Sequence, residues 1–351
     1  MRTVEVFFLL FLASVESLEE GDDCNLPTGQ KGSCVNIHDC AYARQLLKNK
    51  QYPETCGFEK NNPLVCCIEA EFRTSSETGV LSAAKCKEYY PYKKYFILIG
   101  AAKPSLAKEF PHMAIIGFGD RNDIQWSCGG SLISHTFILT AAHCLGSSEF
   151  GAAKFVRLGD LDIASDTDEA APQDFDVKRT FAHPGYRRPA RYHDIGLIEL
   201  DRKVKLTEFV AIACLDTHRE HNETQMTVTG WGRTEFLGNP SSHLLKANFN
   251  VVPNSVCRSA YQKTSPSLLP SGIVDDAQIC AGGTKDQDTC QGDSGGPLQV
   301  INGERSSSII VFDIVGVTSF GKACGLSATP GVYTRVYNYL SWIESIVWPY
   351  S

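Results

Sequence analysis

The chain has 351 residues, of which 43% are hydrophobic, so it is long enough for one large or two unequal domains with a sizeable core. Its formal net charge of −7 gives no basis for a nucleic-acid-binding surface. Its 14 cysteines, an even number, indicate disulfide bonds and therefore an oxidising compartment.

The first residues are typical of a cleaved secretory signal. Arg2 precedes an apolar run from Val6 to Ala13 that is far too short to span a bilayer, and small residues follow before Glu19. We therefore expect residues 1–17 to be removed. Because no later stretch is long and apolar enough for a membrane helix, we expect the mature protein to be soluble and secreted.

A dense group of cysteines follows, namely Cys24, Cys34, Cys40, Cys56, Cys66 and Cys67. A segment this short cannot build a sufficient hydrophobic core, so disulfides are expected to stabilise it. Zinc binding is the alternative, but the adjacent pair Cys66 and Cys67 suits tetrahedral ligation poorly. Six cysteines allow many connectivities, and the sequence alone does not choose among them.

Between this segment and residue 99 the composition changes. Residues 71–79 are polar and lack periodicity, which predicts a flexible linker. Cys86 then stands alone, followed by a basic and aromatic run from Lys87 to Phe96.

From Ile99 onward the pattern is that of a β protein. Short apolar or alternating runs recur between turn residues, at Met113–Ile116, Phe137–Leu139, Phe155–Leu158, Ile195–Ile198, Met226–Thr229 and Ile309–Phe312. Strands at such spacing predict an all-β barrel or sandwich. One helix is predicted at the C-terminus, where Val336, Leu340, Ile343 and Val347 recur at helical spacing and form a core-facing stripe.

Three motifs in this region carry residues suited to nucleophilic catalysis. The stretch Thr289–Pro297 places Ser294 in a glycine-rich turn. A serine hydroxyl needs a base, a group that orients the base, and donors for the developing oxyanion. Upstream, Leu139–Cys144 contains His143 and Tyr192–Leu197 contains Asp194. The order His, Asp, Ser is one of the known orders of a catalytic triad.

With these motifs in that order, the chain resembles the chymotrypsin-like serine proteases. The cysteine spacing of residues 24–67 resembles the clip domain of arthropod clip-domain serine proteases. The stretches Phe110–Ala114, Gly230–Gly238 and Val317–Lys322 are similar to the Snake-like branch of that family. The resemblance implies an all-β fold of two packed six-stranded β-barrels with a C-terminal helix, preceded by a small disulfide-stapled clip domain.

The same resemblance divides the chain into a signal peptide at 1–17, a clip domain at 24–67, a linker or light-chain remainder at 68–98 and a catalytic domain at 99–351. It implies that His143 is the general base, that Asp194 orients it and that Ser294 is the nucleophile. The N–H groups of Gly292 and Ser294 would form the oxyanion hole. His193, next to Asp194, is interpreted as a structural neighbour.

Substrate specificity is expected to depend on a few further residues. The resemblance places Asp288 at the bottom of the primary pocket and Gly321 and Gly331 at its walls, which favours cleavage after Arg or Lys. A solvated loop acid is the alternative for Asp288. The backbone from Ser319 to Gly321 would bind the substrate as an added strand.

Activation by cleavage is also implied by the resemblance. The cut is expected between Leu98 and Ile99, and the new N-terminal amine is expected to pair with Asp293. Members of the family usually begin there with Ile-Val-Gly-Gly, whereas this chain has Ile99-Gly100-Ala101-Ala102. The implied disulfides are Cys24–Cys66, Cys34–Cys56, Cys40–Cys67, Cys86–Cys214, Cys128–Cys144, Cys257–Cys280 and Cys290–Cys324.

Two further sites are suggested by short patterns. Asp160 and Asp162 lie near a calcium loop found in some relatives, with an ordinary acidic loop as the alternative. No cofactor is otherwise expected. Asn222 begins a glycosylation sequon.

The expected function is that of a secreted serine endopeptidase zymogen in haemolymph or the perivitelline space. Its substrate would be a downstream clip-protease zymogen in a Toll or melanisation cascade, with an upstream activating protease and serpin inhibitors as partners, and with neither nucleic acid nor membrane. One alternative is a clip protein that cannot be activated and acts as a scaffold or cofactor, although the complete triad argues against it. A digestive protease is a second alternative, but such an enzyme would not need the clip segment.

Overall fold

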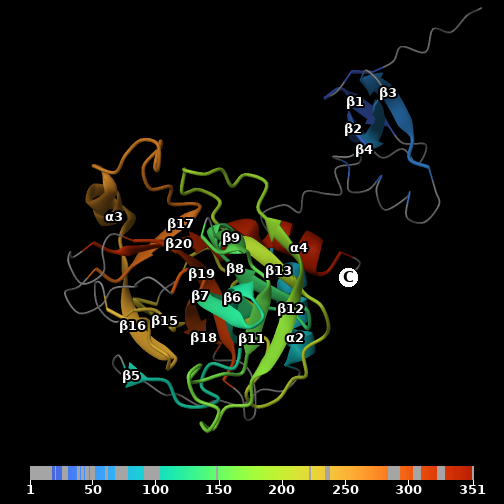
Figure 1. The fold of residues 1–351 in the computed structure, drawn as a ribbon. Coiled ribbons are helices and arrows are strands. Elements are labelled where there is room, and N and C mark those ends of the chain that lie inside the picture. The colour runs from blue at the N-terminus through green and yellow to red at the C-terminus, as the bar shows by residue number, and fades with distance from the viewer. Residues whose placement is uncertain are drawn as a thin grey trace, which may run out of the picture. The chain divides into compact units, whose positions relative to one another are not determined.

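The structure is a computed structural model, and it divides the chain into two compact units, Met1–Glu77 and Thr78–Ser351 (Figure 1). It describes residues 18–19, 21–25, 31–37, 40, 43, 47, 52–59, 62–67, 78–90, 103–147, 149–220, 223–233, 238–283, 293–302, 310–321 and 329–349. Within these ranges, no helix has the length and apolar character needed to cross a membrane.

The N-terminal unit is built on a four-stranded antiparallel sheet in the order β1-β2-β4-β3. Its strands are β1 (Asp23–Asn25), β2 (Lys31–Asn36), β3 (Thr55–Glu59) and β4 (Asn62–Cys67). Neighbouring residues of a strand point to opposite faces of a sheet. The adjacent side chains of Cys66 and Cys67 at the end of β4 therefore point to opposite faces of the sheet, where each forms its own disulfide.

Three disulfides hold this sheet together, namely Cys24–Cys66, Cys34–Cys56 and Cys40–Cys67. They are the three pairings implied by the sequence resemblance. Among the described residues of this unit other than cysteines, few side chains are buried, and Leu64 and Val65 are the largest of those. The disulfides therefore supply much of the stability that a larger core would provide.

The first barrel of the second unit is a closed six-stranded sheet in the order β11-β12-β13-β8-β7-β6. Its strands are β6 (Met113–Asp120), β7 (Asp123–Leu132), β8 (Phe137–Thr140), β11 (Phe155–Leu158), β12 (Gln173–Ala182) and β13 (Gly196–Leu200). A two-stranded hairpin, β9 (Gly146–Ser147) and β10 (Gly151–Ala152), lies beside it. Aliphatic side chains such as Ile116, Leu132, Ile138 and Val156 fill its core.

The second barrel is also six-stranded, because pairing between β19 and β20 closes the sheet. Its strands are β15 (Gln225–Gly230), β16 (Leu245–Val252), β17 (Gln278–Ala281), β18 (Pro297–Ile301), β19 (Phe312–Phe320) and β20 (Gly331–Arg335). Two short strands extend it, β14 (Cys214–Leu215) on β19 and β5 (Lys103–Pro104) on β16, and helix α3 (Asn254–Tyr261) follows β16. The predicted double β-barrel is therefore confirmed.

Most of the predicted runs coincide with strands, and the run from Ile309 to Phe312 is the exception. Ile309 is outside the described residues, Ile310 and Val311 are not in a strand, and β19 begins only at Phe312. At the C-terminus, the predicted helix begins as a 3-10 turn at Val336–Tyr339 and continues as α4 (Leu340–Val347). The four stripe residues are all buried, and they join the core of the first barrel.

The sequence did not predict helix α2 (Val80–Tyr89), which belongs to the second unit rather than to a linker. The Cys86–Cys214 disulfide attaches it to β14. The Ser82 N–H and hydroxyl both donate to Glu344 Oε1 of α4, each at 2.8 Å. Its apolar residues do not follow a clean helical stripe, so its stability comes from these tertiary contacts.

Candidate active site

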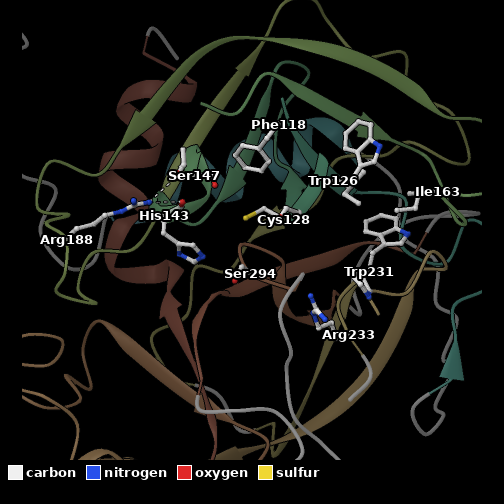
Figure 2. Close-up of a pocket in the computed structure, with 14 residues that line it drawn as sticks. Phe118, Trp126, Cys128, His143, Ser147, Ile163, Arg188, Trp231, Arg233 and Ser294 are labelled. Atoms are coloured by element: carbon white, nitrogen blue, oxygen red, sulfur yellow. Dashed lines mark hydrogen bonds between the residues drawn. The ribbon is translucent and has the colours of Figure 1, made fainter. Parts of the chain in front are cut away.

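Three segments carry the predicted catalytic residues, and two of these residues, His143 and Ser294, are drawn in Figure 2. His143 lies on a 3-10 helix, Ala142–Leu145, directly after β8, and Asp194 lies just before β13. Ser294 precedes β18 of the second barrel. The N–H of Gly129 on β7 donates to the Ser294 carbonyl oxygen at 2.8 Å, so this turn is attached to the first barrel. His143 and Ser294 line the same cavity.

His143 is held by Asp194 through two hydrogen bonds. The backbone N–H of His143 donates to Asp194 Oδ1 at 3.0 Å, and its ring Nδ1 lies 2.8 Å from Oδ2. The Ser319 hydroxyl donates to the same Oδ2 at 2.5 Å, and the Thr334 hydroxyl donates to the Asp194 carbonyl oxygen at 2.9 Å. Because Nδ1 is engaged by the carboxylate, Nε2 is the ring nitrogen left for a proton transfer.

The Asp194 carboxylate is fully buried. Burial raises its pKa, but the hydrogen bonds from His143 and Ser319 and the charge of His143 outweigh that effect and hold the pKa below its usual value. Asp194 is therefore anionic at neutral pH. A buried carboxylate with this set of donors can orient an imidazole and stabilise its charged form.

His193 lies next to Asp194 and has a structural environment. Its backbone is left-handed, with φ of 53°, and its carbonyl accepts a hydrogen bond from the Ile195 N–H at 2.8 Å. Its ring Nδ1 lies 3.1 Å from the Tyr339 hydroxyl, and the ring stacks on His183 at 5.1 Å between centroids. These contacts agree with the interpretation of His193 as a neighbour of the site.

The turn that carries Ser294 requires glycine at the next position. Gly295 has φ of 80°, and an added Cβ would lie 2.2 Å from Thr140 Oγ1 and 2.6 Å from the Gly129 carbonyl oxygen. The Gly295 N–H donates to the Thr318 carbonyl oxygen at 2.9 Å. Ser294 is therefore presented by a turn fixed to both barrels.

Asp293 lies against the segment Gly230–Gly232. The Gly232 N–H donates to Asp293 Oδ1 at 3.0 Å. A Cβ added at Gly230 or Gly232 would lie 2.2 or 2.5 Å from atoms of that carboxylate. Only the absence of side chains at these two positions makes room for it.

The predicted walls of the primary pocket also come together. Gly321 and Gly331 lie at adjoining ends of the strand pair β19–β20, and an added Cβ at Gly321 would lie 4.0 Å from Gly331 Cα. Ser319, which was expected to act through its backbone, has an additional contact through its hydroxyl to Asp194. No local signal in the sequence distinguishes that hydroxyl, because its partner is 125 residues away.

Several predicted residues fall outside the described part of the chain, namely Leu98, Ile99, Asn222, Asp288, Cys290, Gly292 and Cys324. The other disulfides of the second unit are formed as the resemblance implied. Cys128–Cys144 attaches the His143 segment to β7, and Cys257–Cys280 attaches α3 to β17.

Asp160, which was predicted to lie near a calcium loop, has an arginine as its partner. The Arg157 guanidinium donates to Asp160 at 3.2 Å and to Asp174 at 2.6 Å. Burial raises the pKa of Asp160, and Arg157 opposes that rise. Among the described residues, the two groups of three potential metal ligands both consist mainly of disulfide-bonded cysteines, so neither Asp160 nor Asp162 belongs to one.

Comparison with known proteins agrees with this geometry. Residues 99–343 match the family model for trypsin, and residues 24–67 match the model for the regulatory CLIP domain of proteinases. The chain belongs to the clip-domain branch of the trypsin family.

Relatives of this clip-domain family align along most of their length. Serine protease snk of Drosophila melanogaster is 37% identical, with 94% of this chain and 80% of that protein covered. Phenoloxidase-activating factor 1 of Holotrichia diomphalia is 33% identical, with 99% and 100% covered. The crystal structure of Drosophila Grass, a clip serine protease of the Toll pathway, has a TM-score of 0.64 at 28% identity and covers 93% of this chain and 97% of its own.

Proposed function

We propose that this clip-domain protein is a secreted serine protease zymogen that, once cleaved, hydrolyses peptide bonds after Arg or Lys. The observation that carries the proposal is the arrangement of His143, which is fixed by two hydrogen bonds to the buried Asp194 and shares a cavity with Ser294. These are the three groups that acyl transfer through a serine requires.

The reaction would follow from these positions. Ser294 Oγ attacks the scissile carbonyl carbon while His143 Nε2 accepts its proton, and Asp194 stabilises the resulting imidazolium. The N–H groups of Gly292 and Ser294 are proposed to bind the oxyanion. His143 then returns the proton to the leaving amine, and a water molecule repeats the sequence to release the acid from Ser294.

Specificity for Arg or Lys is proposed from the primary pocket. The paired glycines Gly321 and Gly331 support it, because they leave space for a long side chain. Asp288 would supply the charge that a guanidinium or ammonium needs when it leaves water. The backbone of Ser319–Gly321 would pair with the residues before the scissile bond.

Activation is proposed to occur by cleavage between Leu98 and Ile99. The freed amine of Ile99 would pair with Asp293, whose carboxylate has room only because Gly230 and Gly232 lack side chains. An ammonium beside a carboxylate is favoured in its charged form, so such a pair would order the turn that carries Ser294.

The place of this protein in a cascade is proposed from its relatives. Proteins named as a phenoloxidase-activating factor and as a clip protease of the Toll pathway share its two domains. We propose an extracellular role in which an upstream protease activates it, it cleaves a downstream protease zymogen, and serpins control it. The alternative is a scaffold protein that cannot be activated. The stretch Ile99-Gly100-Ala101-Ala102 favours this alternative, whereas the intact hydrogen-bonded pair of His143 and Asp194 argues against it.

We also propose that turnover needs no metal or cofactor. The Arg157 guanidinium provides Asp160 with a positive partner, which supports this proposal. Chelation should then leave the activity unchanged.

The proposed activity is tested with the activated full-length protein and small Arg and Lys ester and amide substrates. Hydrolysis of both is expected, together with labelling of Ser294 by a fluorophosphonate. Ser294→Ala should lower kcat by roughly 10⁶-fold, because the triad acts as a unit. Ser345→Ala, which removes an exposed hydroxyl on α4, is the matched control and should keep full activity. An unchanged rate of hydrolysis in Ser294→Ala would contradict the proposed serine protease activity.

A further inference from the structure

Every polar group of His143 except ring Nε2 has a hydrogen-bond partner among the described residues. Asp194 engages the backbone N–H at 3.0 Å and ring Nδ1 at 2.8 Å. The carbonyl oxygen of His143 accepts from Arg188 Nη2 at 3.2 Å, and the same nitrogen donates to the Gly146 carbonyl oxygen at 3.0 Å (Figure 2). The nitrogen that must exchange a proton with Ser294 therefore belongs to a residue that is held at all its other polar groups.

Both partners of His143 belong to one connection, the loop between β12 and β13. This loop leaves β12 after Ala182 and enters β13 at Gly196. Arg188 lies near its middle, and Asp194 lies near its end. Because Asp194 holds the N–H and the ring while Arg188 holds the carbonyl, the loop grips the histidine from two directions.

Contacts at the base of this loop keep its two limbs together. The His183 ring stacks on the His193 ring at 5.1 Å between centroids, and His183 Nδ1 accepts from the Gly185 N–H at 3.1 Å. A Cβ added at Gly185 would lie 2.8 Å from His193 Cδ2, so a larger residue there would displace the stack. On the second limb, the Tyr192 hydroxyl donates to the Gly272 carbonyl oxygen at 2.8 Å. The middle of the loop therefore projects from a fixed base.

The two neighbouring arginines in the middle of the loop have different contacts. Arg188 Nε donates to the Tyr186 hydroxyl at 3.4 Å, a weak bond that orients the guanidinium. Arg187 donates to the carbonyl oxygens of Pro184 and Tyr186, at 2.6 and 2.8 Å, and so stays within its own loop. Arg188 is therefore the one of the two that reaches the histidine segment.

The carbonyl oxygens that Arg188 binds lie in and directly after the 3-10 helix Ala142–Leu145. The last carbonyl groups of a helix have no partner within it. A guanidinium is always charged and carries several donors in one plane, so it can hold two such oxygens at once. Arg188 is exposed, so water competes for these contacts and their contribution is modest.

We propose that Arg188 is a positioning residue for His143. Its guanidinium fixes the carbonyl end of the histidine while Asp194 fixes the N–H and the ring, so that Nε2 keeps one position beside Ser294. A displacement of about 1 Å between reacting groups can lower a rate roughly a hundredfold. This inference rests on the proposed endopeptidase function and adds to it a residue that need not touch the substrate.

The test compares Arg188→Met with Arg187→Met in the activated full-length protein. Methionine keeps an unbranched stem but has no N–H donor. The matched control is Arg187→Met, because it removes the same charge from the adjacent exposed position without touching the histidine segment. The substrate is a small arginine methyl ester, whose leaving group presents little to the surrounding residues.

We expect Arg188→Met to lower kcat roughly three- to tenfold and Arg187→Met to keep the wild-type value. KM should change little, because acylation and deacylation both use His143 and slow together. Arg188→Lys retains a charged donor group and should recover part of kcat. If Arg188 acted through its charge, its removal would favour the imidazolium and raise kcat, so the sign of the change separates the two roles.

Melting temperatures of all variants are compared with that of the wild type. If Arg188→Met does not fold, Arg188→Gln replaces it, because a shorter polar side chain suits an exposed position and cannot span both carbonyl oxygens. The same loss of kcat is then expected. An equal loss in the variants of Arg187 and Arg188, a higher KM at unchanged kcat, or an unchanged kcat would each overturn the inference.

A second measurement does not depend on turnover. In the Ser294→Ala protein, hydrogen exchange of the segment Ala142–Leu145 is followed by mass spectrometry. Exchange should be faster with added Arg188→Met than with added Arg187→Met, because only the former releases this segment. Equal exchange in the two proteins contradicts the inference. Absence of hydrolysis of every substrate by the wild type would instead contradict the proposed function.

Discussion

At the scale of single residues, the arrangement around Asp194 depends on a hydroxyl as well as on the histidine. The carboxylate accepts from the His143 backbone, the His143 ring and the Ser319 hydroxyl. Burial alone would raise the pKa of Asp194, yet its pKa is lowered. Ser319 therefore helps to keep the orienting group of the site charged, and it is a positioning residue for His143.

The variant Ser319→Ala tests this role. Loss of one hydrogen bond to a buried charge costs about 1.5–3 kcal/mol, so kcat should fall by roughly ten- to a hundredfold. Because the folded-state pKa of Asp194 lies below the unfolded value, its stabilisation is present above the unfolded pKa and is lost as pH falls through the folded one. In Ser319→Ala the folded pKa rises, so acid unfolding should begin at a higher pH.

The readouts for Ser319 are kcat and the pH dependence of the melting temperature between about pH 5 and 2. Ser319→Thr retains the hydroxyl and should recover much of both. If Ser319→Ala lowers kcat without moving the acid limb of stability, its effect does not pass through Asp194.

At the scale of elements, helix α2 is the piece whose position is decided by contacts with distant parts of the chain. It is held by the Cys86–Cys214 disulfide, by Glu344 and by Tyr90, whose hydroxyl donates to the Ile212 carbonyl oxygen. Trp348 adds a hydrogen bond from its indole N–H to the Tyr89 hydroxyl at 3.1 Å. Helix α2 and Tyr90 are thus held by non-covalent contacts in addition to the disulfide.

This docking predicts the behaviour of the cleaved protein. After cleavage between Leu98 and Ile99, the wild type should run as one species on an unreduced denaturing gel and as two after reduction. With Cys86→Ser and Cys214→Ser, the two chains should still co-elute in native size-exclusion chromatography, because α2 remains bound to α4. Adding Glu344→Ala removes the acceptor of both Ser82 donors and should release the shorter chain.

A control for this experiment is Glu88→Ala, which removes an exposed partner of Lys85 on the outer side of α2. It should leave co-elution intact. Separation of the chains in the cysteine variant alone would show that the disulfide is the main attachment.

At the scale of the whole molecule, the two barrels meet around a buried histidine. His112 precedes β6, and its ring lies 5.2 Å from the Phe312 ring of β19. Burial lowers the pKa of His112 to about 4, and the neighbouring Gln299 side chain of β18 opposes this only in part. His112 is therefore neutral at physiological pH. Protonating its ring would place a positive charge inside the buried junction of the two barrels.

The sign of the resulting pH dependence follows from linkage. Between the ordinary pKa of 6.5 and about 4, the unfolded chain protonates His112 and the folded one does not. Stability should therefore fall as pH decreases through this interval, by about 3 kcal/mol for this residue. In His112→Leu this contribution is absent, so the free energy of unfolding, measured with urea, should fall less steeply from pH 6.5 to 4.

Above pH 7 the two proteins should differ only by a constant amount, because His112 is then neutral in both states. Parallel curves for the wild type and His112→Leu over the acidic interval would contradict the assignment.

The sequence by itself determined the residues of the site and the kind of fold. His143, Asp194 and Ser294 each lie in a short motif, and the alternation of apolar residues in runs such as Phe155–Leu158 is a local property of the chain. The stripe of Val336, Leu340, Ile343 and Val347 indicated the last helix for the same reason. Such patterns can be recognised in the sequence because they depend only on residues a few positions apart.

Only the tertiary structure decided which distant groups meet. Ser319 lies 125 residues from Asp194, and Ser82 lies 262 residues from Glu344, so no local pattern could connect them. Helix α2 was missed because its stability comes from α4 and a disulfide rather than from its own periodicity. The cavity beside His143 and Ser294 is likewise lined by Trp126, Arg188 and Arg233, which come from separate loops and strands that only the closed barrels bring together.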